Sequence, residues 1–405
     1  MKTQSALDRR DRARPPRSVV PLLLSSAGRQ PAFYVGHALA GFLVLLLAGC
    51  ERSQPPAAPA TVKPAPAATQ ATQPVIQLGR RTDTFIDRED PLDLRLMSYN
   101  ISWNSIFPDV NPGRAAKFAR LVAALNPDIL ALQEIGVTPP KGNQPAGPKR
   151  TADDVVQLLN RIAPHGSGRT WYAFQGKDCV IASKYPLKMT SERMTPPGER
   201  ELALALVDLP DEDFGLDLYI LNNHYKCCDP EKNDALRQQQ SDAIVAWLRD
   251  ARTPGGNIDL PERTAIVVVG DFNIVGSLQP LQTLLEGNIS DEEKYGADSP
   301  PDWDGSALAD AHPLHNVAGP DDWTWRDDTG KFQPGRLDYV IYTDSVFDAV
   351  KKFALNTATL SEEELKAAGL EKYDTAQDDV GKNYDHLPLV VDFRPTLDAM
   401  TEPVE

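Results

Sequence analysis

Six short apolar segments of the chain each carry, at one end, a polar residue of a type that enzymes use for catalysis. Apolar runs of this length, bounded by turn residues, indicate buried strands. Functional groups are commonly presented at the rim of such a rigid sheet, so we expect these polar residues to meet there. The segments are LRLMSYN with Asn100, PDILALQE with Glu134, YILNNH with His224, VVVGDFN with Asp271 and Asn273, RLDYVIY with Asp338, and YDHLPLVVDF with Asp385 and His386.

Strands and helices alternate unevenly between residues 91 and 396. Three capping patterns predict helix starts, and a further helix is expected over 234–249. Residues 286–333 read as surface loops with one short strand at Trp323–Trp325. Strands cluster in the middle of the chain, which favours an α+β domain of two sheets packed face to face with helices outside. The caps are Asn111 before Pro112, Thr151 with Asp154, and Ser361 with Glu364; the other expected strands lie over 94–101, 129–133, 171–174, 179–183, 202–209, 216–223, 265–269, 337–342 and 387–393.

The first 50 residues have the parts of a secretory signal: a basic stretch, an apolar run over 38–49 and small residues before Cys50. Leu47-Ala48-Gly49-Cys50 also matches the bacterial lipobox, in which the cysteine becomes the lipidated first residue. The alternative is an uncleaved membrane anchor, but the run has 12 apolar residues and a span needs about 20. We expect a lipoprotein signal peptide over 1–50 and an exported protein of the cell envelope, anchored through Cys50 to the outer or cytoplasmic membrane and facing away from the cytoplasm.

Residues 51–90 are rich in Pro, Ala, Thr and Gln, so we predict a flexible linker there. Residues 397–405 are expected to form a C-terminal tail. The whole chain carries a net charge of −15, and residues 1–50 contain seven basic and two acidic residues, so the remainder carries −20. A sequence-independent grip on a nucleic-acid backbone needs an excess of Lys and Arg. This charge disfavours tight non-specific DNA binding but allows a locally basic groove.

Three cysteines remain besides Cys50, namely Cys179, Cys227 and Cys228. An exported protein can form disulfides, and an odd number leaves at least one thiol unpaired or shared with another chain. Adjacent Cα atoms are about 3.8 Å apart, which would strain a bond between Cys227 and Cys228. A disulfide from Cys179 to one of this pair is therefore the expected one. The alternative is that the cysteines serve as small buried apolar residues.

The polar residues at the predicted rim are of the types that phosphodiester hydrolysis requires. Cleavage needs neutralisation of the phosphate charge, an activated water and protonation of the leaving oxygen. Hard oxygen ligands suit Mg²⁺ or Mn²⁺, and Glu134 is the first candidate ligand, with Asn100 and Asp385 beside it. His224 and His386 titrate near neutrality and can move protons.

In this order, and over about residues 92–394, the segments resemble the endonuclease/exonuclease/phosphatase superfamily. That superfamily includes pancreatic-type deoxyribonucleases, abasic-site endonucleases, neutral sphingomyelinases and inositol polyphosphate 5-phosphatases. The resemblance implies a four-layer α/β/β/α sandwich, in which two mixed β-sheets pack face to face between helices, for a catalytic domain over 91–396. The matching motifs are SYNI, LQE, CVIASKYPL, NNHYK, GDFN, RLDYV and DHLPL.

The resemblance also implies roles at a metal centre. Asn100 and Glu134 would help to hold a divalent ion, Mg²⁺ or Mn²⁺, and Asp385 would lie against it. Asp271 would orient or deprotonate the attacking water, and Asn273 would steady the developing oxyanion.

Two histidines complete the implied site. His224 would contact the phosphate or serve the leaving group, and Asp338 would hold His386 in a fixed tautomer. The sequence leaves open whether Asp271 or His386 is the base. Two features depart from the superfamily pattern: Tyr384 stands where many members have Ser, and the histidine strand runs on into Cys227-Cys228-Asp229. Both lie beside the site, so the shape of the substrate pocket does not follow from the resemblance.

Three functions remain open at this point. The first is a monomeric, Mg-dependent phosphodiesterase with nucleic acid as the leading substrate. The second is a phosphatase or phospholipase acting on lipid head groups or inositol phosphates. The third, a binding protein without catalysis, is disfavoured because every polar site residue is present. Fold and metal site do not define the leaving group.

Overall fold

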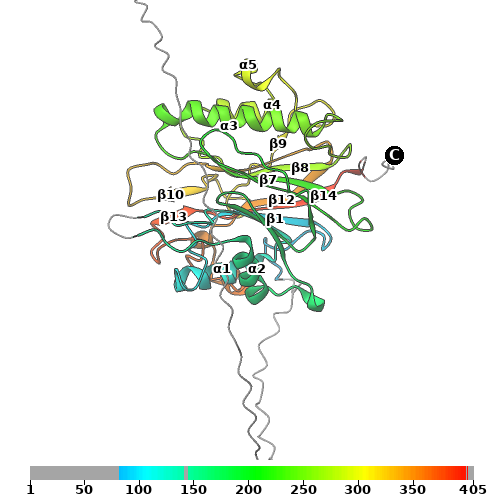
Figure 1. Ribbon diagram of the computed structural model, residues 1–405. Coiled ribbons are helices and arrows are strands. Elements are labelled where there is room, and N and C mark those ends of the chain that lie inside the picture. Colours follow the sequence, from blue (N-terminus) through cyan, green and yellow to red (C-terminus); the bar gives the residue numbers. More distant parts are fainter. Residues whose placement is uncertain (1–81, 141–144, 398, 400–405) are drawn as a thin grey trace, which may run out of the picture. The chain divides into compact units, whose positions relative to one another are not determined.

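The computed structural model describes residues 82–140, 145–397 and 399. The predicted signal peptide with Cys50, the linker as far as residue 81 and nearly all of the predicted tail lie outside the described residues. Within the described part, strands and helices form an α+β sandwich of four layers, which confirms the predicted fold class (Figure 1).

Two six-stranded mixed sheets form the middle layers of the sandwich. The first has the order β12 (Phe347–Ala354), β14 (Leu389–Pro395), β1 (Leu94–Asn100), β2 (Ile129–Gln133), β4 (Cys179–Ser183) and β3 (Tyr172–Gln175). The second has the order β5 (Leu187–Lys188), β6 (Ala203–Val207), β7 (Leu218–His224), β8 (Ala265–Asp271), β11 (Asp338–Tyr342) and β9 (Ala309–Asp310). Each sheet contains one parallel pair, β1 with β2 and β7 with β8, and its other pairs are antiparallel.

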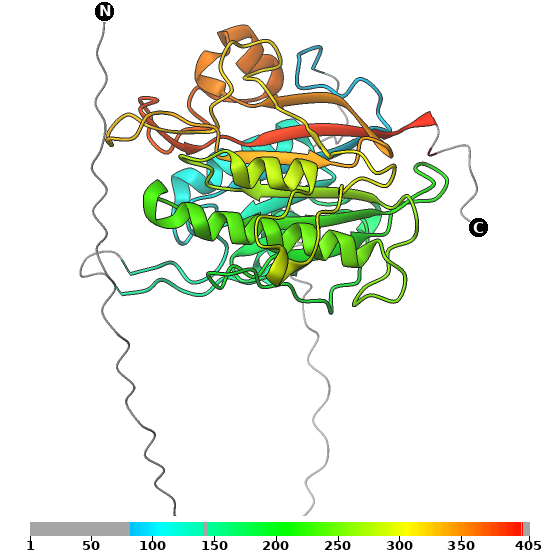
Figure 2. The ribbon, with the colours of Figure 1, turned by 90° about the horizontal axis from the view of Figure 1, so that it is seen from above.

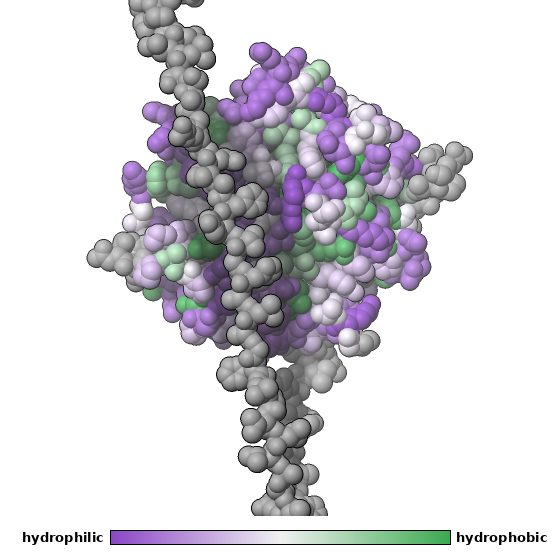
Figure 3. Space-filling view, viewed as in Figure 1, coloured by the Kyte–Doolittle hydropathy of each residue, from purple (hydrophilic) through white to green (hydrophobic). Residues whose placement is uncertain are grey.

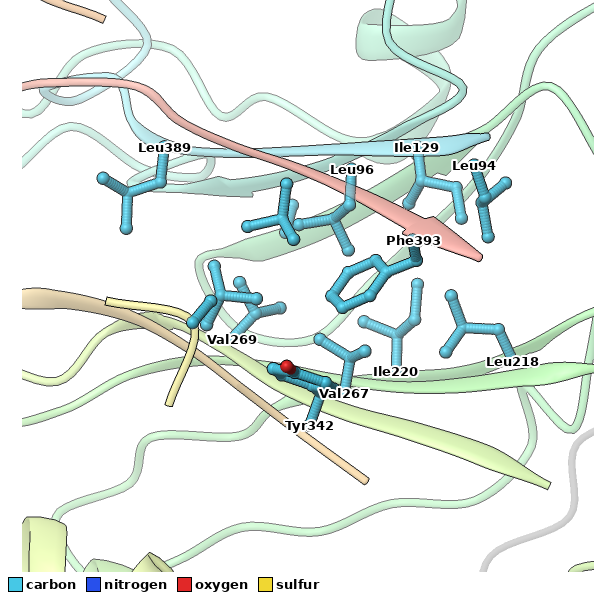
Figure 4. Close-up of a cluster of buried hydrophobic side chains, with 14 of the residues drawn as sticks. Leu94, Leu96, Ile129, Leu218, Ile220, Val267, Val269, Tyr342, Leu389 and Phe393 are labelled. Atoms are coloured by element: carbon cyan, nitrogen blue, oxygen red, sulfur yellow. The ribbon is translucent and has the colours of Figure 1, made fainter. Parts of the chain in front are cut away.

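Aliphatic and aromatic side chains from the two sheets fill the space between them. Figure 4 shows Leu94, Leu96 and Phe393 of the first sheet pointing toward Ile220 and Val267 of the second. All five are fully buried. Burial of apolar surface stabilises by roughly 25 cal/mol per Å², so this continuous layer holds the sheets at a fixed separation. That separation places the ends of the two parallel pairs next to each other.

Helices cover the outer faces of both sheets (Figures 1 and 2). α1 (Pro112–Leu125), α2 (Ala152–Ile162) and α6 (Glu362–Ala368) pack on the first sheet, and α3 (Pro230–Ala251) and α4 (Gln279–Glu286) pack on the second. The three predicted caps are confirmed: the Asn111 side chain accepts from the backbone at Arg114, and capping boxes open α2 and α6. Shorter elements are α5 (Glu292–Tyr295), the two-stranded sheet of β10 (Trp325–Asp327) with β13 (Asn383–His386), and 3₁₀ turns at Gly166–Gly168 and Thr357–Thr359.

The boundary of the folded domain lies earlier than the sequence indicated. Residues 82–90 were expected in the linker, but Ile86 is 1 % exposed and belongs to the core beneath the first sheet. The Phe85 ring packs edge-on against Phe353, and Arg88 forms an ion pair with Asp128. These contacts fix the segment, so the domain begins by residue 82.

Two further local expectations are wrong. Cys179, Cys227 and Cys228 are all free thiols, because Cys179 lies in the core between the sheets whereas Cys228 is exposed in the loop before α3. The short strand expected at Trp323–Trp325 begins instead at Trp325. Trp323 packs against the His315 and Tyr384 rings rather than pairing in a ladder.

Among the described residues, no helix is both long and apolar enough to cross a membrane. On the face in Figure 3, hydrophobic residues lie scattered between hydrophilic ones. Scattered apolar residues are normal on a protein surface.

Candidate active site

The polar residues singled out in the sequence meet where the two parallel strand pairs end. In the first sheet, Asn100 is the register partner of Gln133, the residue before Glu134. In the second sheet, His224 lies opposite Asp271, and Asp271 lies opposite Asp338 in the neighbouring antiparallel strand. Because the sheets face each other, the two sets of strand ends form one buried polar centre.

Asn100 links the two sheets at this centre. Its Nδ2 donates to Oε1 of Glu134 (3.3 Å) and to Oδ2 of Asp271 (3.0 Å). Oε2 of Glu134 accepts from the backbone N–H of Trp103 (2.9 Å). Glu134 adopts φ 66°, an uncommon conformation outside glycine that often marks functional sites. Its pKa is raised by burial and by the like charge of Asp385, against the opposing effect of His224 and His386.

Asp271 is the most connected carboxylate of the centre. Its Oδ1 accepts from the backbone N–H of Asn273 (2.9 Å), and its Oδ2 accepts from Nδ2 of Asn273 (3.0 Å) as well as from Asn100. The Gly-Asp-Phe-Asn segment makes a sharp turn here: Gly270 has φ 135°, and a Cβ on it would lie 2.0 Å from the carbonyl oxygen of Asn223. Only glycine lets β8 approach β7 this closely.

Two histidines point their Nε2 atoms at Asp271, and a different carboxylate holds each ring from behind. Nε2 of His224 lies 3.7 Å from Oδ2 of Asp271, and Nε2 of His386 lies 3.6 Å from the same atom. Nδ1 of His386 donates to Oδ2 of Asp338 (2.7 Å), the contact that the family resemblance implied. Nδ1 of His224 donates to Oδ2 of Asp178 (3.0 Å). Each ring is therefore held in one orientation by its own buried carboxylate.

The carboxylates also favour the protonated form of both rings. Burial alone would lower each histidine pKa, but for His224 the hydrogen bond to Asp178 and the charge of Asp271 outweigh it, and the pKa is raised. For His386 the charges of Asp338 and Asp271 likewise outweigh burial, and the pKa lies well above its usual value.

Asp385 lies at the side of the centre near Glu134. It adopts φ 54°, and its Oδ1 accepts from the indole N–H of Trp325 (3.2 Å). The pairing of β10 with β13 fixes the strand that carries both Asp385 and His386. The centre thus gathers the Glu134, Asp271 and Asp385 carboxylates in partly buried surroundings. This set of hard oxygen donors and mutually repelling charges fits a divalent cation such as Mg²⁺ or Mn²⁺.

Comparison with known proteins places the chain in a family. The sequence model of the Endonuclease/Exonuclease/phosphatase family matches residues 97–352, more than half of the chain. The chain belongs to the endonuclease/exonuclease/phosphatase family. Its members hydrolyse phosphoester bonds. No curated protein sequence matches the chain.

Solved structures of the same superfamily are similar at low sequence identity. The human Nocturnin catalytic domain is 15% identical, with a TM-score of 0.46, and the match covers 75% of this chain and 95% of that one. An endonuclease/exonuclease/phosphatase from Beutenbergia cavernae is 19% identical (TM-score 0.44; 75% and 72% covered). TDP2 from D. rerio, complexed with a single-strand DNA product, is 15% identical (TM-score 0.44; 75% and 99% covered).

A second grouping of possible metal ligands in this family member is Asp271, Asp338 and His386, whose ligand atoms lie within 4.8 Å of one another. Oδ2 of Asp338 already accepts from His386 and from the Thr324 hydroxyl (2.5 Å). A hydrogen-bonded acid–His pair is the simpler description of these two residues. The remaining carboxylates, on the Glu134 side, are the better donors for a cation.

Sequence reasoning missed several residues that support the site. Asp178 orients His224, and Arg200 in turn donates to Asp178 Oδ2 (2.9 Å). Neither residue ends an apolar run: Asp178 follows Gly176-Lys177 in a polar turn, and Arg200 lies in a loop. The available signal was the position of Asp178 directly before the CVIAS strand, which begins at the rim where β2 ends because the two strands are antiparallel.

Proposed function

We propose that this protein is a metal-dependent hydrolase of phosphodiester bonds and that nucleic acid is its leading substrate. The observation that carries the proposal is the pair of buried histidines, each backed by its own carboxylate, that converge on Asp271 from 3.7 and 3.6 Å. Glu134 and Asn100 adjoin the same point. A structural polar cluster does not need two oriented imidazoles whose Nε2 atoms face one carboxylate.

The arrangement suits in-line attack by water. The water oxygen forms a bond to phosphorus while its proton passes to the Asp271–His386 pair. The bond from phosphorus to the leaving oxygen breaks, and His224 supplies a proton to that oxygen. Asp178 and Asp338 keep the two rings oriented, and Asn273 donates toward the developing negative charge.

A divalent ion, Mg²⁺ or Mn²⁺, would be held by Glu134, Asn100 and Asp385. When bound, it would supply charge neutralisation for the phosphate, which is worth several kcal/mol in such enzymes. The support for this proposal is that Glu134 shares the centre with a second carboxylate: burial, and then the charge of Asp385, raise the pKa of Glu134.

The test is a substrate panel with the full chain purified in detergent. It includes single- and double-stranded DNA, RNA, a bis-aryl phosphate, sphingomyelin and inositol phosphates, each with Mg²⁺, Mn²⁺, Ca²⁺ or EDTA. We expect EDTA to abolish hydrolysis and Glu134→Ala to lower turnover about 10²-fold or more. Full activity in EDTA would refute the metal mechanism, and cleavage restricted to sphingomyelin or inositol phosphates would replace nucleic acid with a head-group substrate.

We also propose that the mature protein is a monomeric lipoprotein of the cell envelope, anchored through Cys50. The support is the lipobox sequence Leu47-Ala48-Gly49-Cys50 after an apolar run, followed by a linker rich in Pro and Ala.

A further inference from the structure

A cavity of about 790 Å³ adjoins the candidate active site. Its walls include Trp103, whose backbone N–H donates to Glu134, and Asp178, which holds the His224 ring. Lys226, two residues beyond His224, also lines it. The cavity therefore lies beside the residues that support the candidate active site, and its volume is typical of a ligand pocket.

The cavity is positively charged although the chain as a whole is acidic. The charged residues in its walls are the cations Lys149, Lys177, Arg200 and Lys226 and the single anion Asp178. Lys177 pairs with Glu199, and Arg200 pairs with Asp178. Lys149 and Lys226 form no ion pair within the described part of the chain. Two uncompensated cations in a chain of net charge −15 indicate a site for an anion.

Trp103 brings an aromatic ring to the same wall on a fixed turn. Ser102, Trp103 and Asn104 have φ values of 58°, 45° and 60°, three consecutive non-glycine residues in the left-handed region. Such a conformation persists only where surrounding contacts impose it. Here Asn104 Nδ2 donates to the Gly136 carbonyl (2.8 Å), and the Gly136 N–H donates back to Asn104 Oδ1 (3.0 Å). No aromatic or cationic side chain of the described residues stacks on the Trp103 ring.

We propose that Trp103, Lys149 and Lys226 form a subsite for the nucleotide next to the scissile phosphate. Its base stacks on Trp103, and its phosphate lies between Lys149 and Lys226. Aromatic platforms beside cationic grooves bind single-stranded nucleic acid in this way, without sequence preference. This inference rests on the proposed phosphodiesterase function and defines its substrate as a single-stranded polynucleotide.

The first experiment measures binding without catalysis. Fluorescence anisotropy follows a labelled single-stranded oligonucleotide titrated with the full chain in EDTA. We expect the double variant Lys149→Ala/Lys226→Ala to bind at least 10-fold more weakly and to show a shallower salt dependence, by about 0.7 in the log–log slope for the one phosphate that is no longer neutralised. The control is Lys352→Ala, which removes an exposed lysine on the edge strand β12 at the far side of the first sheet.

The second experiment measures kcat/KM with Mg²⁺ on that oligonucleotide and on p-nitrophenyl methyl phosphate, which is too small to reach the subsite. Stacking contributes about 1–3 kcal/mol per base, so Trp103→Ala should lower kcat/KM on the oligonucleotide about 5- to 150-fold. Trp103→Phe should retain most of it. Both variants keep the backbone N–H that donates to Glu134, so the loss on the small ester should be much smaller than the loss on the oligonucleotide. An abasic nucleotide beside the scissile phosphate should remove that difference.

Equal losses on both substrates would show that these residues act on the catalytic centre and would overturn the subsite. Unchanged binding in the double variant would overturn the subsite as well. So would activity on inositol phosphates that depends on the two lysines but not on Trp103. Failure of the proposed phosphodiesterase has a different signature, since neither substrate would then be hydrolysed while the EDTA titration would still report on the subsite.

Discussion

At the scale of single residues, the decisive feature is a buried carboxylate behind each histidine. Asp338→Asn should preserve the fold but lower kcat, because the amide cannot hold and stabilise the protonated His386 ring at 2.7 Å. General acid–base groups contribute about 10²- to 10⁴-fold. The double variant Asp338→Asn/His386→Ala should be hardly slower than His386→Ala, since residues that act as a unit lose activity non-additively. Losses that multiply in the double variant would show that the two residues act independently.

The sequence predicted these residues because each stands at the end of an apolar run. Asn100, Glu134, His224 and Asp271 lie at the ends of such runs, and strand pairing then brings them together. Asp178 follows no apolar run, and its contact with His224 depends on the packing of one sheet against the other. That packing is set by side chains far apart in the sequence, so no local pattern reveals the partner.

At the scale of elements, a buried amide pair joins the two sheets just beneath the active site. Nε2 of Gln133 on β2 donates to Oδ1 of Asn222 on β7 (2.7 Å). Nδ2 of Asn222 donates to the carbonyls of Leu132 and Val180 (3.0 Å each). Both amides are fully buried in the layer between the sheets.

Asn222→Leu should lower the free energy of unfolding by about 1–3 kcal/mol, because it leaves one N–H of the Gln133 amide without an acceptor while the other still donates to the Ala131 carbonyl. Adding Gln133→Leu should cost less than the same change in the wild type, since it removes the orphaned group. Urea denaturation of the two single variants and the double variant measures this coupling. Strictly additive losses would mean that the two amides do not stabilise each other.

Elements were predicted well where their pattern was strong and poorly where it was mixed. β2 and β4 have the expected bounds and α2 begins at its expected cap, because their apolar runs and capping residues are unambiguous. β12 has the sequence FDAVKKFA and lies at a sheet edge, where lysines on an exposed strand break the apolar pattern. α4 begins after Leu278 without a side-chain cap, so nothing local marked its start. β13 is formed by polar residues whose strand conformation depends on pairing with β10.

At the scale of the whole molecule, the proposed anchor would tie the folded domain to a membrane. Cys50→Ala should abolish incorporation of labelled palmitate and leave unprocessed precursor, because the thiol itself accepts the acyl chain. Membrane fractionation with the label detects both effects. Cys228→Ala, which removes an exposed thiol of the folded domain, is the matched control and should label normally. Equal labelling of Cys50→Ala and wild type would refute the lipoprotein assignment.

The acidic centre should also make the stability of the whole domain depend on a metal. Without a cation, the ionised Glu134 is buried beside Asp385, and this unfavourable environment is reflected in its raised pKa. Glu134→Gln removes that charge, so the metal-free variant should unfold at a higher temperature than the metal-free wild type.

An ion that binds only the folded chain adds about 2.7 kcal/mol at 100 times its Kd, which for a domain of this size corresponds to a rise of several degrees in Tm. Scanning calorimetry in EDTA and in Mg²⁺ should therefore show a Mg²⁺-dependent rise for the wild type and almost none for Glu134→Gln. Glu286→Gln, a change on the exposed surface of α4, should behave like the wild type. A variant that keeps the full Mg²⁺ increment would place the cation away from Glu134, and the grouping of Asp271, Asp338 and His386 would become the site to test next.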